Sequence, residues 1–368
     1  MESSKRLIRL RARLSELKLD AVLTLDTANI RWLSSWAEVF DAEQAHLALI
    51  TKNKNHLHTD SRYREAMQAK DKEGSWQISA KPVGHFSFVR EVMARSRKPE
   101  LRLGYESSIR LDQYRALKKA LAGSRIKLVE TTGLFSGLRA VKDEEEVRLL
   151  HKAQGITDAA FKEVLTLLKP GVSELEIANH LEFILREKGA QGVAFPSIVA
   201  SGPHSAFPHA CPTKRRLRRG DFVVLDFGAR YLDYSADMTR TVVVGEASDR
   251  QRVVYEAVLA AQTQAKSSIK VGITGKDAYE VAQEELKQVG LDEAFTHALG
   301  HGVGIEVHEQ PTLSPQNTKP LVAGNIVTIE PGVYIPGFGG VRIEDFGVVG
   351  ETGFATFTRS PHKLIEIC

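Results

Sequence analysis

The first 130 residues alternate between a helical and a strand-like spacing of hydrophobic positions. Between Ser4 and Leu17 the leucines fall three or four positions apart, which is the period of one helix face. Short apolar runs bounded by polar residues predict strands at 21–25, 46–51, 56–59, 101–104 and 126–130. The spacing also predicts helices at 61–70, 86–95 and 111–122. This alternation is typical of an α/β domain.

The pattern changes near residue 138. Residues 133–141 follow neither period, and the acidic run at 143–146 then begins a helix predicted to reach Leu168. Acids are favourable in the first turn of a helix because of the helix dipole. We therefore predict one domain at 1–138 and a second at 139–368. The first lacks a glycine-rich phosphate loop, so we expect it to be a scaffold or a substrate gate.

The second domain contains two related halves. The strings KPGVS and KVGIT lie 101 positions apart, at 169–173 and 270–274. Each precedes a predicted helix with a capping hydroxyl and an acid three positions later. Gly189 and Gly290 end these helices at the same offset. The sequence therefore predicts an internal duplication.

Each half also contains a hairpin with an acid in each arm. In the first, Asp226 follows the apolar run 223–225, and the chain is predicted to turn at 231–232 and return through Asp237. That register would place the two carboxylates opposite each other, about 5 Å apart at Cβ. An Asp before a turn often bonds only its own backbone, so this hairpin alone is ambiguous.

A second hairpin of the same kind favours a metal site over a simple turn. Glu330 and Glu344 flank a predicted turn centred on Gly337, and they lie 104 and 107 positions after Asp226 and Asp237. If the halves pack about a pseudo-two-fold axis, four carboxylates converge on one centre. Like charges in an apolar setting need cations, so we predict about two divalent metal ions there.

Histidines lie between the capped helix and the hairpin in each half, among them His204 and His209 in the first and His301 and His308 in the second. A lone histidine is more often structural than functional. His301, however, lies among glycines in GHGVG, which allow a close approach of the backbone. Oxygen ligands with one imidazole suit Mn²⁺, Co²⁺ or Zn²⁺ better than copper or an iron–sulfur cluster.

Composition narrows the possible partners. The net charge of +4, from 50 basic and 46 acidic side chains, gives little reason to expect nucleic acid as a partner. The basic run 214–219 is interpreted as a solvated loop before a strand that begins at Phe222. The two cysteines, Cys211 and Cys368, indicate neither a disulfide framework nor a thiolate metal site. With no signal peptide and no long apolar run, we expect a cytoplasmic protein without a membrane partner.

The second domain contains four strings that resemble the pita-bread metallopeptidases: LDFGARYLDYSADMTRT, GHGVGIEVHE, TIEPGVY and GGVRIED. This family includes aminopeptidase P, prolidase and methionine aminopeptidase, and the strings are similar to its Xaa-Pro peptidase branch. The resemblance covers the whole chain. It implies an α/β N-terminal creatinase-like domain plus an α+β C-terminal pita-bread domain with internal pseudo-two-fold duplication. It also implies a homodimer in which Trp32 or Trp36 reaches a neighbour's site.

The resemblance implies a ligand set for two metal ions, with Mn²⁺ expected first and Co²⁺ or Zn²⁺ as alternatives. Asp226 would bind one ion, His301 and Glu330 the other, and Asp237 and Glu344 would bridge them. Glu330 would also be the general base for the attacking water.

Three more residues match positions that act on the substrate in this family. His209 and His308 would hold the peptide and stabilise the tetrahedral intermediate, and Arg342 would lie near a bridging carboxylate. His204 stands where the family more often has another polar residue. The substrate would be a peptide with proline at its second position, and the sequence leaves open whether it is a dipeptide or a longer chain.

Two other functions remain as alternatives. A carboxylate-rich binuclear site also suits the hydrolysis of another bond, such as a phosphoester. A catalytically inactive pita-bread binding module would show lost ligands, whereas all five ligand positions here hold acids or histidine.

Overall fold

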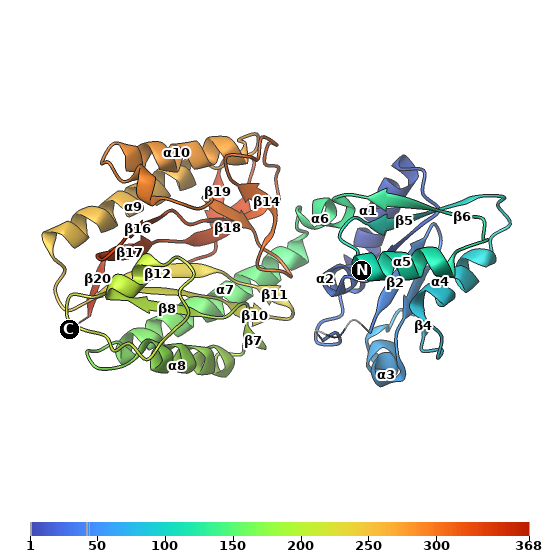
Figure 1. The fold of residues 1–368 in the computed structure, drawn as a ribbon, viewed down its shortest axis with the longest axis horizontal. Coiled ribbons are helices and arrows are strands. Elements are labelled where there is room, and N and C mark those ends of the chain that lie inside the picture. Colours follow the sequence, from blue (N-terminus) through green and yellow to red (C-terminus); the bar gives the residue numbers. More distant parts are fainter. Residues whose placement is uncertain (1, 42, 44, 368) are drawn as a thin grey trace. The chain divides into compact units, whose positions relative to one another are not determined.

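The chain divides into two compact units, Met1–Leu138 and Arg139–Cys368, each with its own sheets and helices (Figure 1). The computed structural model describes residues 2–41, 43 and 45–367, so Cys368 lies outside the described residues. In the described part of the chain, no helix combines the length and the hydrophobicity needed to cross a membrane.

The N-terminal unit contains a six-stranded mixed sheet with helices packed against it. Its strands are β1 (Ala21–Thr24), β2 (Leu47–Thr51), β3 (Asn55–His58), β4 (Trp76–Ser79), β5 (Leu101–Glu106) and β6 (Ile126–Thr131). Its helices are α1 (Glu2–Glu16), α2 (Thr27–Ser34), α3 (Ser61–Lys70), α4 (His85–Ala94), α5 (Leu111–Ala120) and α6 (Leu134–Arg139), which ends just past the unit. The strand order is β4-β3-β2-β1-β5-β6.

The elements expected in this unit are present with ends shifted by two residues or fewer, and three further elements were missed. Strand β4 lies at the edge of the sheet and only Trp76 in it is buried, so it lacks a clear alternation. Helices α2 and α6 are too short for a periodic signal. Residues 133–141, where the periodic pattern breaks, contain α6, which is anchored by the buried side chains of Leu134, Phe135 and Leu138.

Trp32 and Trp36 are interior residues of the N-terminal unit. Trp32 has no exposed surface, and Trp36 is 7% exposed and packs with its ring centroid 5.8 Å from that of Trp76. Neither ring is presented on the surface of the described chain. The expectation that one of them reaches a neighbouring subunit is therefore not supported by their burial.

The C-terminal unit contains two pairs of long helices with strands between them (Figure 1). The helices are α7 (Glu144–Val164), α8 (Glu174–Glu187), α9 (Asp249–Ser268) and α10 (Gly275–Lys287), with short 3₁₀ segments η1 (Leu165–Leu167), η2 (Gly202–Ala206) and η3 (Asp292–Ala294). Helix α7 thus ends before the predicted Leu168, because its last turn tightens into η1.

Strands of this unit form two larger sheets and two small ones. They are β7 (Gly192–Val193), β8 (Ile198–Ser201), β9 (Phe222–Phe227), β10 (Ala229–Tyr231), β11 (Tyr234–Ser235), β12 (Met238–Val244), β13 (Gly300–Gly302), β14 (Glu309–Leu313), β15 (Ile326–Ile329), β16 (Gly332–Ile335), β17 (Gly339–Arg342), β18 (Asp345–Val349), β19 (Phe354–Thr356) and β20 (Ile365–Ile367). The larger sheets have the orders β20-β12-β9-β8 and β14-β13-β15-β18-β19. The small ones are β11-β10-β7 and β16-β17.

The two halves of this unit repeat the same local structure. Ser173 caps α8 and Thr274 caps α10, and each makes the reciprocal bonds of a capping box. Gly189 and Gly290 follow these helices with φ of 98° and 69°, a conformation that favours glycine. The predicted caps and helix ends are confirmed.

The first acidic hairpin differs from its predicted register. Asp226 in β9 pairs with Thr239 in β12 rather than facing Asp237. The turn is formed by Leu232 and Asp233, both with positive φ, one position later than predicted. A shift of one position at the turn moves the pairing by two residues, so Asp226 and Asp237 are diagonal neighbours on one face.

The second acidic hairpin has its predicted register. The pairs Gly332↔Arg342 and Ile329↔Asp345 lie on either side of Glu330 and Glu344, which therefore face each other. Gly337 lies at the turn with a φ of 77°.

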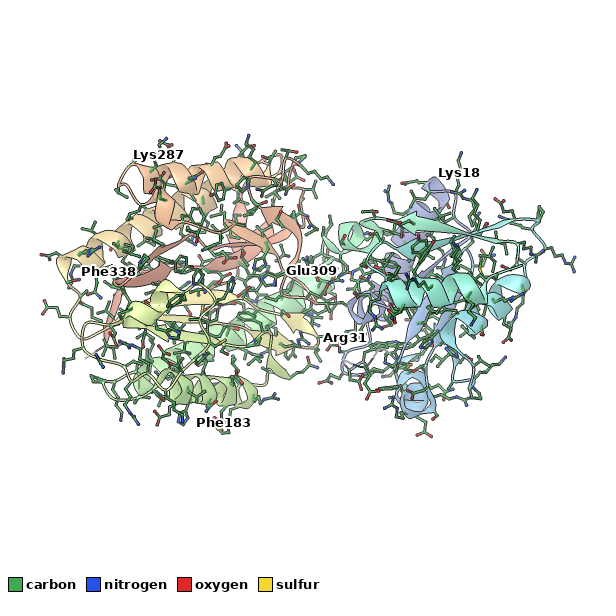
Figure 2. All side chains as sticks on the ribbon, viewed as in Figure 1. Lys18, Arg31, Phe183, Lys287, Glu309 and Phe338 are labelled. Carbon is green, nitrogen blue, oxygen red and sulfur yellow. The ribbon has the colours of Figure 1, made fainter. Side chains whose placement is uncertain are left out.

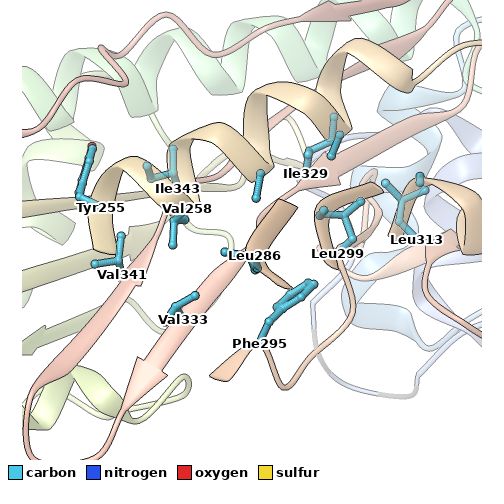
Figure 3. Close-up of a cluster of buried hydrophobic side chains, with 14 of the residues drawn as sticks. Tyr255, Val258, Leu286, Phe295, Leu299, Leu313, Ile329, Val333, Val341 and Ile343 are labelled. Carbon is cyan, nitrogen blue, oxygen red and sulfur yellow. The ribbon is translucent and has the colours of Figure 1, made fainter. Parts of the chain in front are cut away.

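Packing on the outer faces of the sheets directs these acids inward. In β9, Val223, Leu225 and Phe227 belong to the apolar cluster formed with α7 and α8, so Asp226 points to the opposite face. The second half has its own cluster (Figure 3), whose labelled members are Tyr255, Val258, Leu286, Phe295, Leu299, Leu313, Ile329, Val333, Val341 and Ile343. The acids thus lie on the faces that turn away from both apolar clusters.

Candidate metal centre

The residues predicted from the sequence line one cavity of about 440 Å³ in the C-terminal unit. Its lining includes all eight of them: His209, Asp226, Asp237, His301, His308, Glu330, Arg342 and Glu344. Cavities of this size are typical of small-molecule and peptide sites. His204 is not among the lining residues.

Asp226 has one carboxylate oxygen that is paired and one that is not. Oδ2 accepts a hydrogen bond from Nη2 of Arg342 at 2.6 Å. Oδ1 is buried and, within the described residues, has no hydrogen-bond partner. A buried oxygen without a partner is costly, and a cation at this position would satisfy it.

Thr239 connects the two hairpins at the centre. Its hydroxyl donates to Oε2 of Glu344 at 2.7 Å, and its carbonyl accepts from the N–H of Glu344 at 3.1 Å. Glu344 and Asp237 are 2% and 4% exposed. Asp237, His301 and Glu344 each offer a ligand atom within 4.8 Å of the others, and this arrangement can hold a metal ion.

His301 is oriented with one ring nitrogen toward the acids. Its Nδ1 donates to the carbonyl of Gly302 at 3.1 Å. This leaves Nε2 facing Glu330 Oε1 at 3.2 Å and Asp237 Oδ2 at 3.6 Å. A backbone carbonyl on the far nitrogen is the usual way in which proteins orient a metal-binding imidazole.

The protonation of the centre shows how strongly its charges compete. Burial raises the pKa of Asp237 and of Glu344 well above the ordinary value, and the neighbouring carboxylates raise it further. Burial also raises the pKa of Asp226, although Arg342 opposes the shift. A cation bound among these acids would oppose the burial and the repulsion that raise their pKa values.

Glu330 and His301 have the opposite shifts. Burial alone would raise the pKa of Glu330, but its hydrogen bond to His301 and the charge of His301 lower it to about 2. Burial alone would lower the pKa of His301, but Glu330 and Asp237 raise it to about 9. In this structure protonated His301 thus supplies positive charge to the acids. The donor set, four carboxylates and one imidazole, fits divalent metal ions.

Arg342 is the buried cation of the site and is 4% exposed. Besides its bond to Asp226, its Nε donates to the Thr239 hydroxyl at 3.0 Å and its Nη1 to the Pro208 carbonyl at 3.3 Å. Nη1 also donates to the Tyr334 hydroxyl. Arg342 therefore links β9, β12, β16 and the loop that carries His209.

The two outer histidines lie in the cavity wall with exposed side chains. The ring centroids of His301 and His308 are 4.3 Å apart, with the rings at 67°. The protein atoms that partly surround the His308 ring lower its pKa, and the nearby charge of His301 lowers it further. A neutral or protonated imidazole so placed can donate a hydrogen bond to a bound ligand.

Sequence reasoning missed two polar residues here, His297 and Tyr334. His297 lines the cavity, and its Nε2 lies 3.2 Å from the Tyr334 hydroxyl. Burial lowers the pKa of His297, so its neutral Nε2 accepts from Tyr334. The only sequence signal was the position of His297 four residues before His301.

Comparison with known proteins identifies the family. Residues 148–351 match Metallopeptidase family M24, and residues 6–141 match the Creatinase/Prolidase N-terminal domain. The chain belongs to metallopeptidase family M24. This M24 chain is 38% identical to an uncharacterized peptidase of Bacillus subtilis (strain 168) over 363 residues, which are 98% of this chain and 99% of that one.

Solved structures similar to this M24 chain have the same two-part fold. An Xaa-Pro dipeptidase from Bacillus anthracis superimposes with a TM-score of 0.91 at 36% identity, covering 99% of both chains. An X-Pro aminopeptidase from Thermotoga maritima MSB8 gives 0.88 at 34% identity, covering 98% of this chain and 99% of that chain. The predicted family, fold class and metallopeptidase chemistry are thereby confirmed.

Proposed function

We propose that this M24 chain is a binuclear-metal peptidase that cleaves the bond between the first residue of a peptide and a proline at its second position. The observation that carries the proposal is the convergence of four acids and His301 in one cavity of an M24 chain. Relatives named as Xaa-Pro dipeptidase and X-Pro aminopeptidase support this substrate class.

In this proposal the ligands are divided between two divalent ions, with Mn²⁺ first and Co²⁺ or Zn²⁺ as alternatives. Asp226 would hold one ion, His301 and Glu330 would hold the other, and Asp237 and Glu344 would be shared by the two. The unpaired Oδ1 of Asp226 and the cluster of Asp237, His301 and Glu344 support the assignment. When bound, such ions lower the pKa of a coordinated water and polarise the scissile carbonyl.

The chain's own groups perform the remaining steps. Glu330 would take the proton of the attacking water as general base, since its carboxylate lies in the cavity beside His301. His209 and His308 donate hydrogen bonds to the oxygen that becomes negative in the transition state. Arg342 holds Asp226 and the carbonyl of Pro208 in place.

The apolar part of the cavity wall is suited to bind the proline of the substrate by its shape. Its apolar lining residues include Phe195, Pro196, Ile198, Pro208 and Val307. Proline has no amide N–H and a fixed φ, so an apolar pocket recognises it without a backbone acceptor.

Turnover of two defined substrates tests the function. The enzyme is dialysed against a chelator and assayed with an Xaa-Pro dipeptide and an Xaa-Pro-Xaa tripeptide after each metal is restored. We expect cleavage before proline with Mn²⁺ or Co²⁺ and none without metal. A lack of cleavage of both substrates with every metal would refute the proposal. The relative rates on the two substrates distinguish a dipeptidase from an aminopeptidase.

We further propose that the two domains are 1–138 and 139–368, that the enzyme is a cytoplasmic homodimer, and that neither nucleic acid nor a membrane is its partner. The modest net charge supports the expectation about nucleic acid, and the low cysteine content supports the expectation of a reducing compartment. Sedimentation at micromolar concentration tests the dimer, and a monomer there contradicts it.

A further inference from the structure

A single buried carboxylate, that of Glu174, accepts hydrogen bonds from three residues in one loop. Glu174 is the first residue of α8 and has no exposed surface. Its Oε1 accepts from the N–H and hydroxyl of Ser201 at 2.8 and 2.7 Å. Its Oε2 accepts from the N–H and hydroxyl of Thr213 at 3.0 and 2.6 Å. His204 Nδ1 donates to both oxygens at 3.0 and 2.9 Å.

The bonded groups stand at the two ends of residues 201–213, the loop that carries His209. Between them the loop contributes 208–212 to the wall of the cavity. The His209 side chain is exposed, so the path of the loop backbone decides where its ring lies. Glu174 thus holds both ends of the segment that places His209.

The helix itself does not require an acid at this position. In the second half the matching residue, one after the capping Thr274, is Gly275. A Cβ there would lie 2.2 Å from the carbonyl oxygen of Thr312, so the chain passes in direct backbone contact. The two halves therefore differ at this position. The half that carries His209 has the buried carboxylate of Glu174, and the other half has a close backbone contact at Gly275.

We propose that Glu174 is a positioning residue for His209, with His204 as its hydrogen-bonded partner, and that it sets the rate of peptide cleavage through the loop 201–213. This inference rests on the proposed function. It gives His204, which lies outside the cavity lining, a role in holding the loop rather than in contacting the substrate.

Glu174→Gln is the direct test. The amide replaces one acceptor oxygen by a donor, so the groups bonded to that oxygen lose their acceptor. We expect kcat/KM on an Xaa-Pro-Xaa tripeptide to fall about 10- to 100-fold, as for other displaced active-site supports, with unchanged metal content. Glu176→Gln is the matched control, because Glu176 lies two positions later, is 55% exposed and bonds Ser173. Its activity should stay at the wild-type level.

A double-mutant cycle separates positioning from a general loss of structure. If Glu174 acts through His209, Glu174→Gln adds little further loss in a His209→Ala background. An equal loss in both backgrounds, or an unchanged rate in the single variant, overturns the proposal. If Glu174→Gln does not fold, Thr213→Val removes the hydroxyl that donates to Glu174 and accepts from the N–H of Arg215, and should lower the rate. Thr213→Ser keeps that hydroxyl and should keep the wild-type rate.

A second readout does not depend on turnover. The rate at which diethyl pyrocarbonate modifies His209, mapped by peptide mass, should change in Glu174→Gln and stay constant in Glu176→Gln. If the wild-type enzyme cleaves no Xaa-Pro peptide, the proposed function fails while this chemical test still decides the positioning role. Equal modification rates in all three proteins overturn that role.

Discussion

The carboxylate of Glu309, labelled in Figure 2, lies between two buried cationic side chains. Removing its negative charge should destabilise the C-terminal unit. Its carboxylate pairs with Nη2 of Arg139 and, at 3.1 Å, with Nζ of Lys142. The side chains of Glu309, Arg139 and Lys142 are 6%, 6% and 1% exposed. Glu309→Gln keeps the size of the side chain and removes the negative charge between them.

The expected cost follows from burial. Removing one partner of a buried ion pair costs about 3–5 kcal/mol, since it leaves an uncompensated charge in the interior. Glu306 also pairs with Nη2 of Arg139, at 2.7 Å, but its side chain is 52% exposed. Glu306→Gln should cost only about 0–1 kcal/mol, because solvent screens the pair. The two variants make the same chemical change three residues apart.

Calorimetry of the full chain measures the difference. For a domain of roughly 150–250 residues, 1 kcal/mol shifts the unfolding temperature by about 2–4 °C. We expect Glu309→Gln to lower the transition of the C-terminal unit by roughly 6–20 °C and Glu306→Gln by at most about 4 °C. All proteins are treated with chelator first, since bound metal would raise the transition. Equal shifts in the two variants would refute the argument from burial.

Two further predictions concern pH and metal binding. Burial raises the pKa of Glu309, but Lys142 and Arg139 outweigh it and leave the pKa below its ordinary value. The stabilisation is therefore present above a pH of about 4.3 and is lost as the pH falls through the lower folded-state pKa. The gap in unfolding temperature between wild type and Glu309→Gln should narrow on acidification, and a constant gap contradicts this. Asp237→Ala or Glu344→Ala should remove both metal ions, whereas His308→Ala should keep them and lower the rate of cleavage. Metal counting on the purified variants measures this. Two equivalents of metal in an Asp237→Ala or Glu344→Ala protein would show that the bridging assignment is wrong.

The two acidic hairpins show where local sequence suffices for register. The second turn is centred on Gly337, whose freedom at positive φ marks the turn, and its predicted pairing is confirmed. The first turn places Leu232 and Asp233 at positive φ, and neither is a glycine that would mark the turn in the sequence. The register predicted for the first hairpin was therefore wrong by two residues.

Spacing and residue type along the sequence determined the internal duplication, the four acids and His301, and the resemblance to a known family added His209, His308 and Arg342; all eight are among the residues that line the cavity. Tertiary structure alone decided which groups share protons and hydrogen bonds at the centre. The orientation of His301, the unpaired oxygen of Asp226 and the loop held by Glu174 each join segments far apart in the chain. Such contacts depend on distances of a few ångströms that no periodic pattern encodes.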